Sequence, residues 1–329
     1  MTWDELDWNA LERLRTRFLA GPGAEPYWRA PSDLASYALT LGERIGWKWD
    51  HVLRELRVRG WSPRGRAVLD WGCGSGVAGR RLLRAYGAAA FRSLTLWDHS
   101  PLAINFAGEA ARQAFPGVEV QPASPSFLAG EEPIGILLLS HVLNELAPAG
   151  WTELGRLIAR AEAVLWVEPG TRAVSRRLGA ERDRWRTRFS LVAPCPAPGP
   201  CPMFSAGQDR HWCHFFAPPP AEIFADPCWV RFGQRAGIDL RSLPYCFLAL
   251  DQVPSAAPAG VSRVIGRVEH FKPYARLLNC GADGLAELTV PRREAPALCK
   301  ELERRREPLV YRWRRDGDRI LAGEALGDA

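Results

Sequence analysis

Three cysteines lie in one segment that has neither a helical nor a strand period. The segment, CPAPGPCPMFSAGQDRHWCHF over residues 195–215, holds Cys195, Cys201 and Cys213 among prolines and glycines. Five residues separate the first pair and eleven the second, which is wider than the Cys-x2-Cys pairing of zinc ribbons. Such spacing suits a larger metal group, and an iron–sulfur cluster takes four thiolates. The segment therefore predicts a cluster site that needs a fourth ligand.

The fourth ligand must come from elsewhere in the chain. Cys280 stands where a predicted strand enters the glycine-rich turn of LLNCGADG, and we predict it as that ligand. The other candidates fall in apolar or helical segments or in another turn: Cys228, Cys246, Cys299 and Cys73. His211 and His214 are rivals, because a Cys3His zinc site needs only one histidine. Thiols that only pack are disfavoured, since so few core residues surround this segment.

A second group of residues predicts a site for a nucleoside cofactor. Asp70 opens the stretch DWGCGSG, whose Gly72, Gly74 and Gly76 let a ligand lie against the backbone. The helix that follows offers free N–H groups to an anion. Asp98 ends the next predicted strand, where a carboxylate accepts hydrogen bonds from both hydroxyls of a ribose. The alternative is that these glycines only turn a strand into a helix.

Two catalytic candidates follow the fourth predicted strand. His141 and Glu145 lie in SHVLNEL, at the edge of the sheet where ligands bind in doubly wound folds. Either residue has the chemistry of a general acid or base. The alternative, that they cap a helix or shape the cofactor pocket, has equal weight.

The elements around these residues predict the fold class. Short apolar strands alternate with amphipathic helices from residue 67 to about 190, which indicates a doubly wound α/β domain with a parallel sheet. We predict three parts: a helical region at 1–60, the cofactor-binding α/β domain at 61–258 with the cysteine segment inserted at 195–215, and a small β-rich module at 259–329.

Composition narrows the setting. The 329 residues carry a net charge of +6, and arginine clusters such as those at 176–188 and 301–319 indicate contact with RNA phosphates. The alternatives are a solvated helix face and an arginine-rich composition set by codon bias. The longest apolar run is too short to cross a membrane, and the acidic start is unlike a secretory or transit peptide. We expect a cytoplasmic protein, in which eight cysteines serve as ligands or in packing.

The glycine turn with Asp70 and Asp98 resembles the class I S-adenosylmethionine-dependent methyltransferases. That likeness implies a glycine loop facing the methionyl part of the cofactor, Asp70 near its amino group, and Asp98 on the ribose. The further succession of LSHVLNEL, WVEPGT, two Cys-Pro pairs, WCHF and a late Cys-x-x-Asp-Gly resembles the mitochondrial small-ribosomal-subunit assembly methyltransferase-like family, which also has bacterial members.

This second resemblance implies a four-iron, four-sulfur cluster on Cys195, Cys201, Cys213 and Cys280. It also implies association with the small ribosomal subunit and its rRNA during assembly. The acidic N-terminal segment, which is unlike a transit peptide, favours a bacterial member of this family. We expect the protein to be a monomer outside the ribosome. The leading hypothesis is thus a cofactor-binding assembly factor, with or without catalysis. The alternatives are an active rRNA or protein methyltransferase and a zinc-containing small-molecule methyltransferase.

Overall fold

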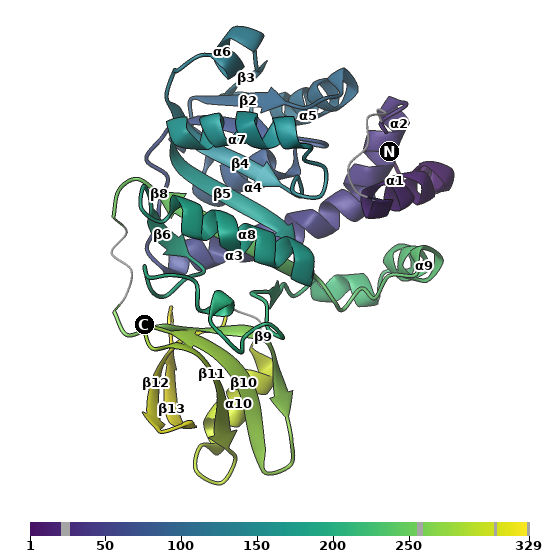
Figure 1. Cartoon of the computed structure of the whole chain (residues 1–329). Helices are drawn as coiled ribbons and strands as arrows, with labels where there is room; N and C mark the ends of the chain where they lie inside the picture. The colour runs from purple at the N-terminus through teal and green to yellow at the C-terminus, as the bar shows by residue number, and fades with distance from the viewer. Residues whose placement is uncertain (21–26, 255–258, 306–307, 328–329) are drawn as a thin grey trace. The chain divides into compact units, whose positions relative to one another are not determined.

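The computed structural model describes residues 1–20, 27–254, 259–305 and 308–327 (Figure 1). The chain forms two compact units. Unit 1 contains residues 1–53, 63–168 and 218–243, and unit 2 contains 54–62, 169–217 and 244–329. The boundary predicted at residue 258 and positions 306–307 of the second arginine cluster lie outside the described residues.

Unit 1 begins with helices, as the N-terminal periodicity predicts. They are η1 (Trp3–Glu5), α1 (Trp8–Ala20), α2 (Pro31–Tyr37), η2 (Ala38–Gly42) and α3 (Glu43–Val58), which ends in unit 2. The apolar stripe of α1 buries Leu14, which packs in one cluster with Trp28, Leu34 and Ala103. This cluster attaches the first two α-helices to the helix that carries Ala103.

The rest of unit 1 is a parallel sheet with helices on both faces. Its strands stand in the order β3-β2-β1-β4-β5. They are β1 (Ala67–Trp71), β2 (Ser93–Trp97), β3 (Glu119–Pro122), β4 (Ile134–Ser140) and β5 (Ala161–Pro169). The connecting helices are α4 (Val77–Tyr86), η3 (Ala88–Ala90), α5 (Pro101–Ala114), α6 (Pro125–Ala129) and α7 (Pro148–Arg160). The predicted doubly wound α/β domain is confirmed.

Strand order determines where a ligand fits in this sheet. The chain runs outward from β1 to β3 and then returns to the other side of β1 with β4. The loops after β1 and β4 therefore diverge at a topological switch point, where doubly wound folds bind their ligands. In Figure 1, α7 lies in front of the strands and α4 behind them. Two further helices, η5 (Ala221–Phe224) and α9 (Pro227–Ala236), complete unit 1.

Unit 2 contains one long helix and a small antiparallel group of strands. The helix is α8 (Arg172–Trp185), and strands β6 (Ser190–Ala193) and β7 (Phe215–Phe216) both pair with β8 (Pro244–Asp251). Between β6 and β7 lies the cysteine segment, with a single short helix η4 (Pro202–Phe204). Its irregular backbone agrees with the absence of any period in its sequence.

The last part of unit 2 is a closed five-stranded barrel in the order β10-β11-β13-β12-β9. Its elements are β9 (Ser262–His270), β10 (Tyr274–Gly281), β11 (Gly284–Pro291), α10 (Pro296–Arg304), β12 (Val310–Asp316) and β13 (Arg319–Ala325). All neighbours are antiparallel except β11 and β13. This Greek-key order is the architecture of the OB-fold.

A buried ion group links distant parts of unit 2. Glu55 accepts hydrogen bonds from the Nε and Nη2 of Arg59 at 3.0 and 2.8 Å, and Arg263 Nη2 lies 3.1 Å from its other oxygen. All three side chains are at most 3% exposed. Arg59 also donates to the carbonyl of Pro194 at 2.9 Å, directly before the cysteine segment. One carboxylate thus balances two buried guanidinium groups.

Removing that carboxylate should destabilise unit 2 strongly. Glu55→Gln leaves two buried arginines without a counter-charge, and breaking such a pair costs about 3–5 kcal/mol. Chemical denaturation measures the free energy of unfolding. Glu324→Gln is the matched control, because Glu324 is 70% exposed and lies 3.9 Å from Arg312. That surface change should cost less than about 1 kcal/mol. Equal losses in the two variants would contradict the role of Glu55.

Candidate functional site

The glycine turn after β1 has a left-handed backbone at each of its three glycines. Gly72, Gly74 and Gly76 have φ values of 73°, 50° and 72°. A Cβ on Gly72 would lie 2.7 Å from a methyl group of Val142, in the loop after β4, whereas a Cβ on Gly74 would meet open space. The predicted turn therefore has a closed side towards β4 and an accessible side at Gly74.

Two carboxyl groups accept backbone hydrogen bonds here, one from the glycine turn and one from the helix that follows it. Asp70, completely buried, accepts the N–H of Gly79 at 3.0 Å, and its Oδ1 is buried without a partner. Asp98 accepts the N–H of Gly74 and that of Ser100, both at 2.9 Å. The structure thus brings the predicted Asp98 to the predicted glycine turn. Each carboxylate keeps capacity for a further hydrogen-bond donor.

Burial changes the protonation of both carboxyl groups. Desolvation raises the pKa of Asp70 to about 7, against the hydrogen bond from Gly79. Desolvation also raises the pKa of Asp98, although two backbone N–H groups oppose it. A cation placed beside Asp70 would favour its ionised form. The unpartnered Oδ1 and the raised pKa are what an ammonium group of a ligand would complement.

The loop after β4 adds a third carboxyl group. Glu145 accepts a hydrogen bond from the hydroxyl of Tyr27 at 3.0 Å, and burial raises its pKa to about 7. Glu168, at the end of β5, is buried and accepts the N–H groups of Val142 and Leu143 at 3.0 and 3.2 Å. Glu168 therefore fixes the backbone of the loop that carries Glu145.

His141 has a different position from the one expected of a proton-transfer group. Its φ of 60° places it in the left-handed region, and its N–H donates to the carbonyl of Val167 at 2.9 Å. The ring Nε2 is buried without a hydrogen-bond partner, and burial, followed by the charge of Lys48, lowers its pKa well below the usual value. His141 is thus a neutral residue of a strained turn, whereas Glu145 titrates near neutrality.

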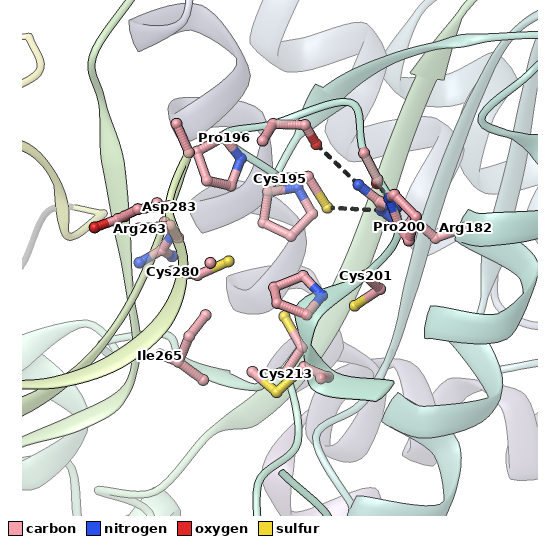
Figure 2. Close-up of a pocket in the computed structure, with 18 residues that line it drawn as sticks. Arg182, Cys195, Pro196, Pro200, Cys201, Cys213, Arg263, Ile265, Cys280 and Asp283 are labelled. Carbon is pink, nitrogen blue, oxygen red and sulfur yellow. Dashed lines mark hydrogen bonds between the residues drawn. The ribbon is translucent and has the colours of Figure 1, made fainter. Parts of the chain in front are cut away.

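Unit 2 holds a separate pocket lined by four cysteines. Cys195, Cys201, Cys213 and Cys280 all line one cavity of about 300 Å³. Figure 2 shows the four thiol groups on different sides of the same hollow. Cys280 comes from β10 of the barrel, and the other three come from the segment between β6 and β7. The four cysteines that we selected as ligands from the sequence thus line the same pocket.

Arg182 of α8 supports the wall of this pocket. It is 4% exposed, and its Nε donates to the sulfur of Cys195 at 3.3 Å. Its terminal nitrogens donate to the carbonyls of Ala197 and Gly199, at 2.9 and 2.5 Å. Asp183 accepts the N–H of Cys201 at 3.1 Å. These hydrogen bonds satisfy backbone groups that regular secondary structure would otherwise pair.

The thiols are buried, and their pKa values are high. Desolvation, and next the charge of Cys195, raises the pKa of Cys201 to about 11 and that of Cys280 to about 12. Burial likewise raises the pKa of Cys213 well above its usual value. Desolvation outweighs the opposing charge of Arg182, so these groups remain protonated at neutral pH.

The other candidate ligands lie elsewhere. Among the described residues that line the pocket there is neither His211 nor His214. The Sγ of Cys246 donates to Pro169 O and that of Cys299 to Val290 O, each at 3.4 Å. Over the described part of the chain, no group of three or more His, Cys, Asp or Glu side chains is arranged so that it could hold a metal ion.

A family match covers most of the chain that contains both sites. The family described as mitochondrial small ribosomal subunit Rsm22 matches residues 50–285. The chain belongs to this family. The match includes the glycine turn, Asp98, the loop after β4 and all four pocket cysteines. It confirms the resemblance that the cysteine pattern indicated. The search of the curated proteins found no match.

Solved structures with a similar fold include several methyltransferases. The plantazolicin methyltransferase BamL, bound to S-adenosylhomocysteine, shares 10% identity over 74% of this chain and 97% of its own, with a TM-score of 0.41. An O-methyltransferase family protein from Burkholderia thailandensis shares 15% identity over 77% of this chain and 70% of its own, with a TM-score of 0.38.

No helix in the described residues of this Rsm22-family chain is long and apolar enough to cross a membrane.

Sequence reasoning missed three residues of these sites. Tyr27 lies far from Glu145 in sequence, and nothing in its neighbourhood indicates their contact. Arg182 stands among the arginines of α8 and is indistinguishable from them by pattern. Glu168 had a signal, because an acid near the end of a strand as apolar as AVLWVEP needs buried hydrogen-bond donors.

The raised pKa of Asp70 predicts how stability depends on pH without added ligand. The folded state favours the protonated carboxyl, so its contribution is full below the ordinary pKa of 3.8 and is lost as pH rises to about 7. Asp70→Asn should therefore lose less thermal stability than the wild type between pH 5 and 7. Melting temperatures across this range provide the measurement, with the exposed Glu109→Gln as control. Parallel wild-type and Asp70→Asn profiles would contradict it.

Proposed function

We propose that this Rsm22-family chain is an S-adenosylmethionine-binding, methyltransferase-like protein that acts in assembly of the small ribosomal subunit and holds an iron–sulfur cluster. The observation that carries the proposal is the convergence of Cys195, Cys201, Cys213 and Cys280 on one pocket, in a chain whose other unit has a methyltransferase-like fold. The family name supports the ribosomal part of the proposal.

The proposed cofactor site is the turn after β1. The open side of Gly74 gives the methionyl part room against the backbone, and the free Oδ1 of Asp70 offers an acceptor for its ammonium. Asp98 would accept hydrogen bonds from the ribose hydroxyls while its bonds from Gly74 and Ser100 fix its orientation. The residues present therefore fit the cofactor, which would supply an activated methyl group when bound.

Asp98 is the sharpest test of this cofactor site. Asp98→Ala should weaken S-adenosylmethionine binding about 10- to 100-fold, since hydrogen bonds to a charged group contribute about 1.5–3 kcal/mol. Isothermal titration calorimetry measures the dissociation constant. Glu109→Gln, an exposed change on α5, should bind as the wild type does. Unchanged affinity in Asp98→Ala would remove Asp98 from the site.

The proposed cluster site is the cysteine pocket. Four thiolates are the usual ligand set of a four-iron cluster, and the cavity exceeds the space of a single ion. Sulfur ligands of one zinc ion lie only about 3.8 Å apart, as follows from tetrahedral bonds of about 2.3 Å. The wide spacing of Cys195, Cys201 and Cys213 along the sequence, unlike the close Cys-x2-Cys pairs of zinc ribbons, favours a cluster over zinc. A cluster would supply the positive charge that buried thiolates require.

Iron content tests the ligand assignment. Cys280→Ser, purified without oxygen, should lose most of its iron and acid-labile sulfide together with its visible absorbance. Cys228→Ser is the matched control, because Cys228 is also a free, partly buried cysteine but lies on α9 in unit 1. Unchanged iron in Cys280→Ser would exclude that ligand. Zinc without iron in the wild-type protein would refute the cluster.

A second function, methyl transfer itself, is favoured by one observation. Glu145 has a raised pKa of about 7 and lies in the loop after β4, so it is suited to accept or donate a proton near neutral pH. Transfer of labelled methyl groups to small-subunit rRNA or protein distinguishes an enzyme from a factor that only binds the cofactor.

A further inference from the structure

The net positive charge of the chain comes from unit 2. Unit 2 contains 25 basic and 16 acidic side chains, whereas unit 1 contains 18 and 21. Unit 2 also contains the five-stranded barrel, whose architecture binds oligonucleotides on the face of its second and third strands and the adjoining loops. Here that face belongs to β10 and β11, together with the β9–β10 loop.

Part of this face is already covered. Cys280 of β10 lines the cysteine pocket, and Arg210 of the cysteine segment donates to Glu287 of β11 at 3.0 Å. On β9, the N–H of Gly266 donates to the carbonyl of His214 at 2.8 Å. The cysteine segment therefore occupies the half of the barrel face near the β10–β11 turn.

The other half carries an aromatic pair. Phe271, in the β9–β10 loop, is 39% exposed, and its ring centroid lies 5.0 Å from that of Tyr274 at an angle of 35°. The N–H of Phe271 donates to the carbonyl of Tyr274 at 2.9 Å, which closes the turn and holds both rings in place. An exposed aromatic ring on a closed turn offers a π-face on which a base can stack.

Cationic groups surround this pair. Lys272 lies between the two aromatic residues in sequence, and the guanidinium of Arg276 lies 5.3 Å from the Phe271 ring centroid. Arg276 pairs with Glu269 at 2.5 Å, but both side chains are about half exposed. Such surface pairs contribute little, so a phosphate can replace the carboxylate with a small loss. Arg292 pairs in the same way with Glu303 at 2.7 Å.

We propose that Phe271 and Tyr274 are a stacking platform for unpaired bases of single-stranded RNA, with Lys272 and Arg276 on its phosphates. The proposal rests on the proposed ribosomal function and specifies its RNA. Aromatic side chains stack on bases that are splayed out of a helix, whereas an A-form duplex presents its backbone and 2′-hydroxyls instead. The platform therefore selects loops or unfolded segments over paired RNA.

Fluorescence anisotropy with the full chain and a labelled 12-nucleotide oligouridine tests the platform. Phe271→Ala and Tyr274→Ala should each weaken binding about 5- to 100-fold, in line with about 1–3 kcal/mol per stacked base. Lys272→Ala should reduce the slope of log affinity against log salt by about 0.7. Phe224→Ala is the matched control, since Phe224 is 48% exposed but lies in unit 1, and it should bind as the wild type does.

Three outcomes would overturn the platform: wild-type affinity in both aromatic variants, equal loss in Phe224→Ala, or equal wild-type affinity for a duplex of the same length. Thermal melting shows that the variants are folded. Co-sedimentation of the wild type with small subunits is measured separately. Its failure would overturn the proposed ribosomal function, whereas wild-type co-sedimentation with unchanged RNA affinity in Phe271→Ala would overturn the platform alone.

Discussion

The guanidinium of Arg182 holds in place a segment that has little regular secondary structure of its own beyond the short helix η4 (Pro202–Phe204). Between β6 and β7 the backbone carbonyls have no neighbouring strand to bond with. Arg182 instead donates hydrogen bonds to the carbonyls of Ala197 and Gly199, and it also donates to the sulfur of Cys195. Arg59 does the same for Pro194, and its own charge is balanced by Glu55. The shape of the cysteine pocket thus depends on two buried arginines as much as on the thiols.

Burial affects the protonation of the two candidate sites differently. At the turn after β1, desolvation keeps Asp70 near its titration point, where a ligand's positive charge would shift it to the anion. In the cysteine pocket, desolvation keeps Cys201, Cys213 and Cys280 protonated, so the thiolates that a metal group requires form only together with that group. The first site is prepared before its ligand arrives, and the second is completed by it.

Much of unit 1 is predictable because its signals are local. The strand-turn-helix pattern around Gly72–Gly76 and the apolar run of β4 determine their own elements, and parallel strand order then brings Asp98 to the turn. The barrel is less predictable, since a β-rich composition does not specify that β11 pairs with β13. Spacing, turn context and the family resemblance selected four cysteines that the structure places around one pocket.

The residues that support the two candidate sites were not predictable from the sequence. Arg182 is one arginine among several on α8, and only tertiary packing selects it. The partnership of Tyr27 with Glu145 depends in the same way on a contact across 118 positions of the chain. For His141 the sequence allowed either proton transfer or a role in shaping the pocket, and its strained turn and neutral ring favour the second role.

The division of charge between the units has a consequence for how this molecule meets a polyanion. With an excess of nine positive charges in unit 2 and of three negative charges in unit 1, the electric field of an RNA attracts one unit and repels the other. Both forces act over about a Debye length, roughly 8 Å at physiological salt, before any surface is in contact. Unit 2 would therefore be the part of the chain that a polyanion attracts first.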